Sequence, residues 1–362
     1  MNKGKKNLVH ITALKGIACF FVMLGHYFGM IKYSSSFNIS VGTMEILKSN
    51  WMFLLNESLW LQLFFVASGY LLACTNIKTF KEMVVKSFRR FLRLAIPVFF
   101  TCTIVYIIYV LFGFENKETA KLFVNDWFQG SLSGEYTVVS VLKSPIDVLI
   151  LGNADMNTPY WVLKDMFFAS IYIYLFIYLR NIFMNRSIAT KAIDFLAFVV
   201  SFLLSEIICV CMIGVITRLY EEKLLFLTNA KSKSINIGLS LVFILLIIMC
   251  ITNLKIVSAI LGSVLLLILM KDNKIICNTA FVFLGKYSFG IYAFHWPLIC
   301  SVGAYLIIKL CTLTTLFLSV LVSSMVCILI TILMAYFYGI TLEKLSQKLV
   351  EKITGVVQRI IS

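Results

Sequence analysis

The sequence predicts an all-α membrane protein, a polytopic bundle of about ten transmembrane helices with both termini in the cytoplasm. Three observations lead to this fold class. The chain has 362 residues, is 60% hydrophobic, and has a mean hydropathy of +0.95. Its apolar residues gather in long runs, and a run of about 20 apolar residues has the length of a helix that crosses a bilayer. Its positive charges are also distributed unevenly between the connecting segments.

Apolar runs predict the individual spans. We expect them at 11–31, 57–75, 95–113, 159–179, 189–205, 207–220, 236–253, 255–270, 287–309 and 314–338. The division between 189–205 and 207–220 rests on a slight polar break at Ser205 and Glu206. The first run is long and lacks a small-x-small cleavage site, so we interpret it as a span and not as a cleaved signal peptide.

The charge distribution sets the orientation. With the N-terminus inside, about three-quarters of the 32 Lys and Arg residues fall on the inner side. This threefold bias is the one expected for cytoplasmic connections. The net charge of +15 then follows from the topology, and we expect membrane lipid and no nucleic acid as a partner. Usage rich in Lys, Ile and Asn is typical of AT-rich bacterial genomes, so we expect a multi-pass protein of the cytoplasmic (inner) membrane.

The chain reads as one membrane domain over 1–345 and a short cytoplasmic tail over 346–362. No internal repeat of 20–50 residues is visible. Two segments expected outside are long, 33–56 and 114–158. The apolar stretch 138–151 is too short to span, so we expect it to lie at the interface or to fold back into the bundle. A large outer segment on a compact bundle suits an acceptor site or a lid.

Ten cysteines are present, and none forms a CxxC pair. Most, such as Cys19, Cys102 and Cys327, fall inside apolar runs. We interpret them as small buried hydrophobic residues, and we expect no metal site.

Lys15 and His26 lie in the first predicted span. Ionisable residues inside a span are costly and point to function. Eleven residues at about 100° each return to nearly the same helical face and rise roughly 16 Å. One stripe of one helix therefore offers a cation near one membrane face and an imidazole deep inside. The structural alternative for His26 is a buried imidazole satisfied by a neighbouring carbonyl or Tyr.

The other two histidines favour structural interpretations. His295 is followed by Trp296 and Pro297 within a span, where a Pro kink frees a carbonyl that the imidazole can satisfy. His10 lies at the inner interface.

A basic cluster precedes the third predicted span. It contains Lys86, Arg89, Arg90 and Arg93. Arg90 and Arg93 are three residues apart, so they share a helical face and can converge on one anion. The alternative is a basic cluster that only faces anionic lipid headgroups.

Five motifs together resemble the acyltransferase-3 family of integral membrane acyltransferases. They are Lys15-x10-His26, the segment FFVASGY at 64–70, Arg90-x-x-Arg93 before Pro97, the segment LGKYSFGIYAFHWP at 284–297, and YGITLEK at 338–344. They occur in order on the predicted spans and cover nearly the whole chain.

Two positions depart from the family pattern. Lys15 stands where many relatives have Arg, which replaces a planar fork with a point charge. Many relatives carry an acid five residues after the Trp of the fourth span, where this chain has Met166 after Trp161. The nearest acid, Asp165, points about 100° away from that face. The fourth predicted span of this chain therefore resembles that of the relatives that lack the acid.

The resemblance implies transfer of an acyl group, usually acetyl from cytosolic acetyl-CoA, to a hydroxyl of a cell-surface polysaccharide or lipid-linked glycan. Acetyl-CoA would be the acyl donor, with no bound cofactor. Lys15, Arg89, Arg90 and Arg93 would receive the phosphates of the acyl-CoA. His26 would be the catalytic residue, either as general base or as a covalent acyl carrier.

Five further residues are possible contacts to the acceptor or the transition state: Ser68, Tyr70, Trp161, Lys164 and Asp165. Four of them have a structural alternative. Ser68 suits close helix packing, Trp161 an interfacial aromatic belt, and Lys164 with Asp165 a local ion-paired network.

Two other functions compete with acyl transfer. A transporter of a glycan or a small anion would use the same basic and His path without chemistry, although such proteins often show internal repeats. A sensor or scaffold would leave the buried Lys15 and His26 unexplained.

Overall fold

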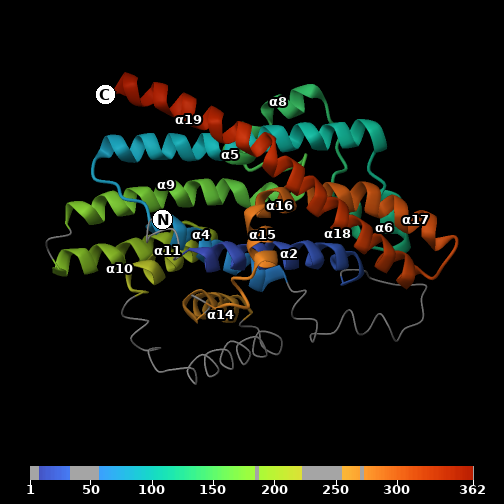
Figure 1. Ribbon diagram of the computed structural model, residues 1–362, viewed down its shortest axis with the longest axis horizontal. Coiled ribbons are helices and arrows are strands. Elements are labelled where there is room, and N and C mark those ends of the chain that lie inside the picture. The colour runs from blue at the N-terminus through green and yellow to red at the C-terminus, as the bar shows by residue number, and fades with distance from the viewer. Residues whose placement is uncertain (1–7, 33–56, 184–186, 222–254, 270–272, 362) are drawn as a thin grey trace.

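The computed structural model describes residues 8–32, 57–183, 187–221, 255–269 and 273–361, and these residues are helical with no β-strand among them (Figure 1). The all-α class is therefore confirmed. The longer helices are α2 (Val9–Lys32), α4 (Glu57–Ala73), α5 (Phe80–Phe112), α9 (Trp161–Ile182), α10 (Ser187–Leu204), α11 (Glu206–Leu219), α14 (Lys255–Leu269), α18 (Leu316–Ile340) and α19 (Leu342–Ile361). The shorter elements are α6 (Asn116–Phe123), α7 (Asp126–Gly130), α8 (Val138–Ile146), η2 (Asp147–Leu151), η3 (Thr158–Tyr160), α15 (Thr279–Lys286), α16 (Ser288–Leu298), η4 (Ile299–Gly303) and α17 (Ala304–Cys311).

Within these residues, five helical segments are long and apolar enough to cross a membrane. They are Val9–Met30, Phe80–Phe112, Thr158–Ile182, Ser288–Cys311 and Leu316–Ile360. Two further predicted spans correspond to the shorter apolar helices Leu59–Ala73 and Ala259–Ile268. The predicted spans 189–205 and 207–220 coincide with α10 and α11. The predicted span 236–253 and the outer segment 33–56 lie outside the described residues, so the total of ten spans and the cytoplasmic termini stay predictions.

Close backbone approach holds the first helix of the bundle in place. α2 packs against α15, and α4 packs against α11. A Cβ atom added at Gly69 would collide with the Cys211 carbonyl, and one added at Gly285 would collide with the Thr12 carbonyl. Small residues let helices pack by van der Waals contact where lipid supplies no hydrophobic driving force. The Gly285 contact fixes α2, and with it Lys15 and His26, against α15.

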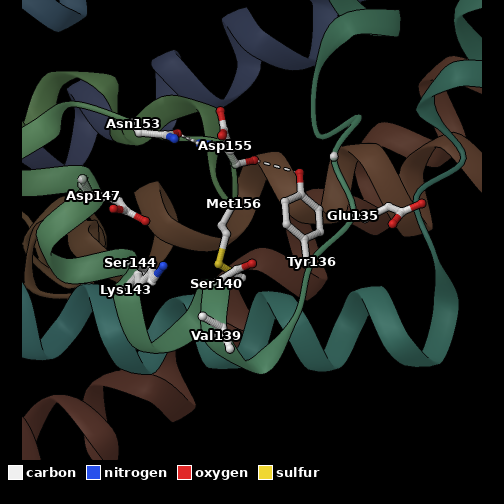
Figure 2. A pocket seen from close by; sticks show the side chains of 12 residues that line it. Glu135, Tyr136, Val139, Ser140, Lys143, Ser144, Asp147, Asn153, Asp155 and Met156 are labelled. Carbon is white, nitrogen blue, oxygen red and sulfur yellow. Dashed lines mark hydrogen bonds between the residues drawn. The ribbon is translucent and has the colours of Figure 1, made fainter.

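The long segment 114–158 folds onto the bundle as α6, α7, α8 and η2. The Glu115 N–H donates to the Cys300 carbonyl at 2.9 Å, and the Asn125 side-chain amide donates to the Met30 carbonyl at 2.9 Å. The apolar stretch 138–151 forms α8 and η2, which pack against α5. Figure 2 shows the loops beside α8, where the Tyr136 hydroxyl donates to the Asp155 carbonyl at 2.8 Å. This segment thereby reaches the beginning of α9.

The expected tail 346–362 lies almost wholly within α19. This helix packs against α5 through one face, on which Ser346, Val350 and Thr354 are buried. In Figure 1 it runs beside the first half of α5 toward the C-terminus.

The glycine contact between α4 and α11 predicts a stability effect. We expect Gly69→Ala to lower the free energy of unfolding by about 1–3 kcal/mol, because the added methyl group must push the two backbones apart. Thermal unfolding of the purified protein in detergent measures the effect. The matched control is Gly355→Ala on α19, where an added Cβ meets nothing within 4 Å. Equal melting temperatures for the two variants would contradict the packing argument.

Candidate active site

α2 carries Lys15 and His26 on one face, both half-buried, and each lines a different cavity. The helical rise between the two residues is roughly 16 Å. We call the cavities the His26 cavity and the cationic cavity. The face of α2 that carries Lys15 and His26 therefore lines both cavities.

The His26 cavity has a volume of about 390 Å³. It is lined by Val22, His26, Leu61, Trp127, Pro159, Trp161, Val162 and Tyr292. These residues come from α2, α4, α7, η3, α9 and α16, so the cavity forms only when segments far apart in the sequence assemble. Most of its wall is apolar or aromatic, and His26 is the residue in it with ordinary acid–base chemistry.

His26 contacts a second histidine. His26 Nδ1 lies 2.8 Å from His295 Nε2, and the two rings stack with centroids 5.1 Å apart. His295 is 1% exposed. Its Nδ1 lies 3.1 Å from the Ile291 carbonyl oxygen, one helical turn earlier in α16. The prediction that His295 satisfies the carbonyl freed by Pro297 is wrong, because His295 Nδ1 contacts the Ile291 carbonyl and the freed Ala293 carbonyl accepts from Asn157. The other ring nitrogen of His295 contacts His26.

The geometry of this chain of contacts assigns the hydrogens. A carbonyl oxygen only accepts, so His295 Nδ1 carries the hydrogen and, in the neutral ring, His295 Nε2 carries the lone pair. His26 Nδ1 must then donate to His295 Nε2. The lone pair of neutral His26 is therefore on Nε2, and this nitrogen has no hydrogen-bond partner among the described residues. A histidine so arranged can accept a proton or attack an electrophile.

Pro297 shapes the part of α16 that carries His295. Proline has no N–H, so the carbonyl of Ala293 loses its helical donor. The side-chain amide of Asn157, from the loop before α9, donates to this carbonyl at 2.7 Å. Beyond Pro297 the helix widens into the π-helical turn η4. Asn157 thus satisfies the kinked backbone beside His295 and joins the 114–158 segment to the site.

Aromatic rings surround the two histidines. Trp296 is 1% exposed and its ring centroid lies 5.4 Å from that of His26. Trp127 packs on Trp296 at 4.8 Å between centroids. The Tyr292 hydroxyl donates to the Pro159 carbonyl. Trp161 is exposed at the edge of the cavity. His295 is therefore enclosed within the bundle, whereas His26 faces the cavity.

The cationic cavity has a volume of about 380 Å³. It is lined by Lys15, Ser68, Leu71, Leu72, Thr75, Lys86, Arg89, Arg90, Arg93 and Tyr174. All four residues predicted to bind acyl-CoA phosphates thus line one cavity. None of its five basic residues lies within ion-pair distance of a carboxylate among the described parts of the chain. A cluster of positive charge of this density favours a polyanionic ligand.

Neutral contacts hold two of these cations in position. Arg90 Nε donates to the Ser170 hydroxyl at 3.0 Å, and that hydroxyl donates to the Met166 carbonyl at 2.7 Å. Lys15 Nζ lies 4.7 Å from the centre of the Phe64 ring. Both cations are oriented without being neutralised.

The remaining candidates lie in different places. Trp161 lines the His26 cavity, and Ser68 lines the cationic cavity while donating to the Phe64 carbonyl at 2.8 Å. The buried Tyr70 donates from its hydroxyl to Glu221 at 2.6 Å. Lys164 Nζ is 3.4 Å from the Leu151 carbonyl, and Asp165 accepts from the Ser205 hydroxyl at 3.5 Å. Tyr70, Lys164 and Asp165 line neither of the two cavities.

Sequence reasoning missed three residues of the site. His295 was given a structural role, although it belongs to a quoted motif and the chain has only three histidines. Asn157 and Trp127 lie in the 114–158 segment, where nothing in the local pattern connects them to α16 or α2. Met166, at the position of the family acid, is buried with its sulfur 3.8 Å from Cys211 Sγ. No carboxylate therefore stands at that position beside Arg90.

Comparison with known proteins gives one match at the level of families. No curated protein and no solved structure matches the chain. The model of the acyltransferase-3 family, described as an acyltransferase domain, matches residues 8–336. This range contains both cavities and both histidines of the site. The chain therefore belongs to the acyltransferase-3 family of membrane acyltransferases.

Proposed function

We propose that this protein is a membrane O-acyltransferase that moves an acetyl group from acetyl-CoA to a hydroxyl of a cell-surface polysaccharide or lipid-linked glycan. The observation that carries the proposal is the lone pair on His26 Nε2, which the contact with His295 directs away from the histidine pair. Membership of an acyltransferase family supports the reaction class. The cationic cavity at the other end of the Lys15–His26 stripe supports an anionic donor.

The donor site is the cationic cavity. The diphosphate of acetyl-CoA would contact Arg90, Arg93 and Lys15, with Arg89 and Lys86 nearby. Charge-assisted hydrogen bonds to phosphate oxygens are the strong ones. The thioester arm would then extend along α2 toward His26, over a rise of roughly 16 Å. With the predicted orientation, the phosphates lie on the cytoplasmic side, where acetyl-CoA is made.

The reaction follows from the chemistry of His26. As a general base, Nε2 takes the proton of the acceptor hydroxyl while the oxygen attacks the thioester carbonyl. The tetrahedral intermediate expels the CoA thiolate, and the protonated imidazole returns the proton to it. His295 Nε2 accepts from His26 Nδ1–H throughout, so it stabilises the imidazolium that forms transiently.

The covalent alternative uses the same lone pair. Nε2 attacks the thioester, the thiolate leaves, and the acetyl-imidazole then passes its acetyl group to the acceptor hydroxyl. Both routes require the hydrogen of His26 on Nδ1. Mass spectrometry of the protein incubated with acetyl-CoA and no acceptor distinguishes them, because only the covalent route leaves an acetyl group on His26.

The acceptor site is the His26 cavity. Trp127 and Trp161 offer aromatic faces on which the apolar face of a sugar ring can pack, as aromatic residues commonly do with amphipathic ligands. Trp127 belongs to the 114–158 segment, and Trp161 begins α9, three residues after that segment ends. A glycan that reaches the cavity from the outer side would bring one hydroxyl to Nε2.

The histidine pair predicts a graded loss of activity. We expect His26→Ala to reduce acetyl transfer from acetyl-CoA by about 10²- to 10⁴-fold, because the proton acceptor is removed. We expect His295→Ala to lower kcat by about 10- to 100-fold with an unchanged KM for acetyl-CoA, because His26 loses its fixed tautomer. His295→Asn should recover part of this loss, since the amide oxygen can accept from His26 Nδ1–H.

The matched control for packing damage is Cys300→Ala. Cys300 is fully buried near His295 and lines neither cavity, so this variant should keep its kcat. If His26→Ala retains full transfer activity, the proposed mechanism is wrong. If the wild-type protein binds the anion and moves a glycan across vesicles without releasing CoA, it is a transporter and not an enzyme.

The cationic cavity predicts a selective effect on the donor. We expect the double variant Arg90→Gln with Arg93→Gln to raise the KM for acetyl-CoA more than the KM for the acceptor. Added salt should raise the donor KM less in the variant than in the wild type, because fewer charges remain to be screened. The control is Lys344→Gln with Lys348→Gln, exposed positions on α19. A donor KM equal to that of the control would refute the donor site.

A further inference from the structure

A third cavity adjoins the cationic cavity at the end of the bundle where α5 begins. Its volume is about 580 Å³. It is lined by Ala73, Cys74, Thr75, Asn76, Ile177, Arg180, Asn181, Arg218, Leu219, Tyr220 and Glu221. Thr75 lines both cavities. On α9, Tyr174 lines the cationic cavity and Ile177, one turn later, lines the third cavity. We call this third cavity the end cavity.

The two adjoining cavities differ in charge. The cationic cavity has five basic residues and no acidic residue in its wall. In the end cavity each arginine already has a carboxylate. Arg180 Nε lies 2.9 Å from Asp194 Oδ1, and Arg218 forms an ion pair with Glu221. The end cavity is therefore polar but close to neutral, so it suits the uncharged adenine ring. The 3′-phosphate on the ribose of acetyl-CoA would then lie toward the basic residues of the cationic cavity.

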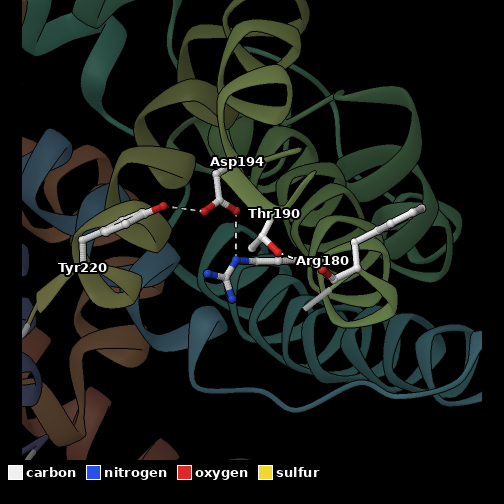
Figure 3. A network of polar contacts seen from close by, with 5 residues as sticks. Arg180, Thr190, Asp194 and Tyr220 are labelled. Atoms are coloured by element: carbon white, nitrogen blue, oxygen red, sulfur yellow. Dashed lines mark hydrogen bonds and ion pairs between the residues drawn. The ribbon is translucent and has the colours of Figure 1, made fainter. Parts of the chain in front are cut away.

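A fixed polar network forms one wall of the end cavity. Figure 3 shows Asp194 between Arg180 and Tyr220, and the Tyr220 hydroxyl donates to Asp194 at 2.7 Å. Asn181 donates to the Ile77 carbonyl at 2.7 Å from its side-chain nitrogen, which leaves the side-chain oxygen to face other donors. A half-buried tyrosine ring, held by its hydroxyl, beside amide and guanidinium groups is a surface on which a heterocyclic base can stack and hydrogen-bond.

We propose that the end cavity binds the adenosine end of the acyl donor. This inference rests on the proposed function, because it takes the diphosphate to occupy the cationic cavity. With the diphosphate there, the thioester arm leads along α2 toward His26, and the nucleoside must leave in another direction. The end cavity adjoins the cationic cavity through Thr75. The donor is then a nucleotide thioester, and a phosphopantetheine thioester without the nucleoside leaves the end cavity empty.

Cys74 provides a reporter inside the end cavity. It lines this cavity, and of the cysteines in the described residues it is exposed, whereas Cys277 and Cys311 are half-buried and the others are buried. The experiment measures the rate at which N-ethylmaleimide alkylates Cys74 in the purified full-length protein, by peptide mass spectrometry. The probes are acetyl-CoA and acetyl-4′-phosphopantetheine, neither of which has a free thiol. Each is used at ten times the Kd found by titration calorimetry.

We expect acetyl-CoA to slow alkylation of Cys74 about tenfold, since the site is then empty about one-tenth of the time. Acetyl-4′-phosphopantetheine should leave the rate unchanged, and Cys311, at the end of α17, should react at the same rate with either probe. A second variant, Cys74→Trp, places a bulky indole ring in the end cavity. It should raise the KM for acetyl-CoA about tenfold and leave the KM for acetyl-4′-phosphopantetheine unchanged, whereas Cys311→Trp should change neither.

Two results would overturn the inference while the proposed function stands. One is acetyl-CoA that binds and donates acetyl groups without protecting Cys74. The other is equal protection by acetyl-4′-phosphopantetheine, which has no nucleoside to place in the end cavity. If acetyl-CoA does not bind at all, both the inference and the proposed function fail.

Discussion

The hydrogen bond between His26 and His295 is the interaction on which the rest of the site depends. It requires α2 and α16 to lie within one side chain of each other, although 269 residues separate the two histidines. The close contact of Gly285 with the Thr12 backbone holds α2 against α15, directly before α16. Asn157 satisfies the carbonyl freed by Pro297. The Ile291 carbonyl then fixes the ring of His295. Each contact restricts the motion of α2, α16 or the His295 ring, and so helps to fix the direction of the lone pair on His26 Nε2.

Charge is distributed along the molecule in a way that fits one elongated, unevenly charged ligand. The cationic cavity has five basic residues, oriented by a hydroxyl and an aromatic ring and not by carboxylates. Lys15 and Arg90 are half-buried and Arg93 is exposed, and a cluster of positive charge of this kind favours an anionic ligand. The His26 cavity is lined mostly by apolar and aromatic residues, with His26 as its basic group. The end cavity pairs its own charges internally. In the proposed arrangement, the end cavity, the cationic cavity and the His26 cavity would receive the nucleoside, the diphosphate and the thioester.

The sequence predicted what depends on spacing within one helix. Lys15 and His26 share a face because helix geometry fixes their angle and rise, and the cluster at 86–93 converges on one cavity for the same reason. It also predicted the all-α class from apolar runs. The sequence did not predict the contacts between helices. Neither the pairing of His295 with His26 nor that of Asn157 with the Ala293 carbonyl has a signal in the local sequence pattern. Likewise, the position of Tyr70 depends on α11 packing beside α4, which brings Glu221 to its hydroxyl.

The position of the hydrogen on His26 tests the central claim most directly. The chain contains only three histidines, so protein labelled with ¹⁵N at histidine and placed in lipid bilayers should give few resonances by solid-state NMR, and His10→Gln and His26→Gln variants assign them. The account predicts, at neutral pH, hydrogen on Nδ1 and a bare Nε2 for both His26 and His295, with a detectable coupling between His26 Nδ1–H and His295 Nε2. Hydrogen on His26 Nε2 with a bare Nδ1 would contradict it.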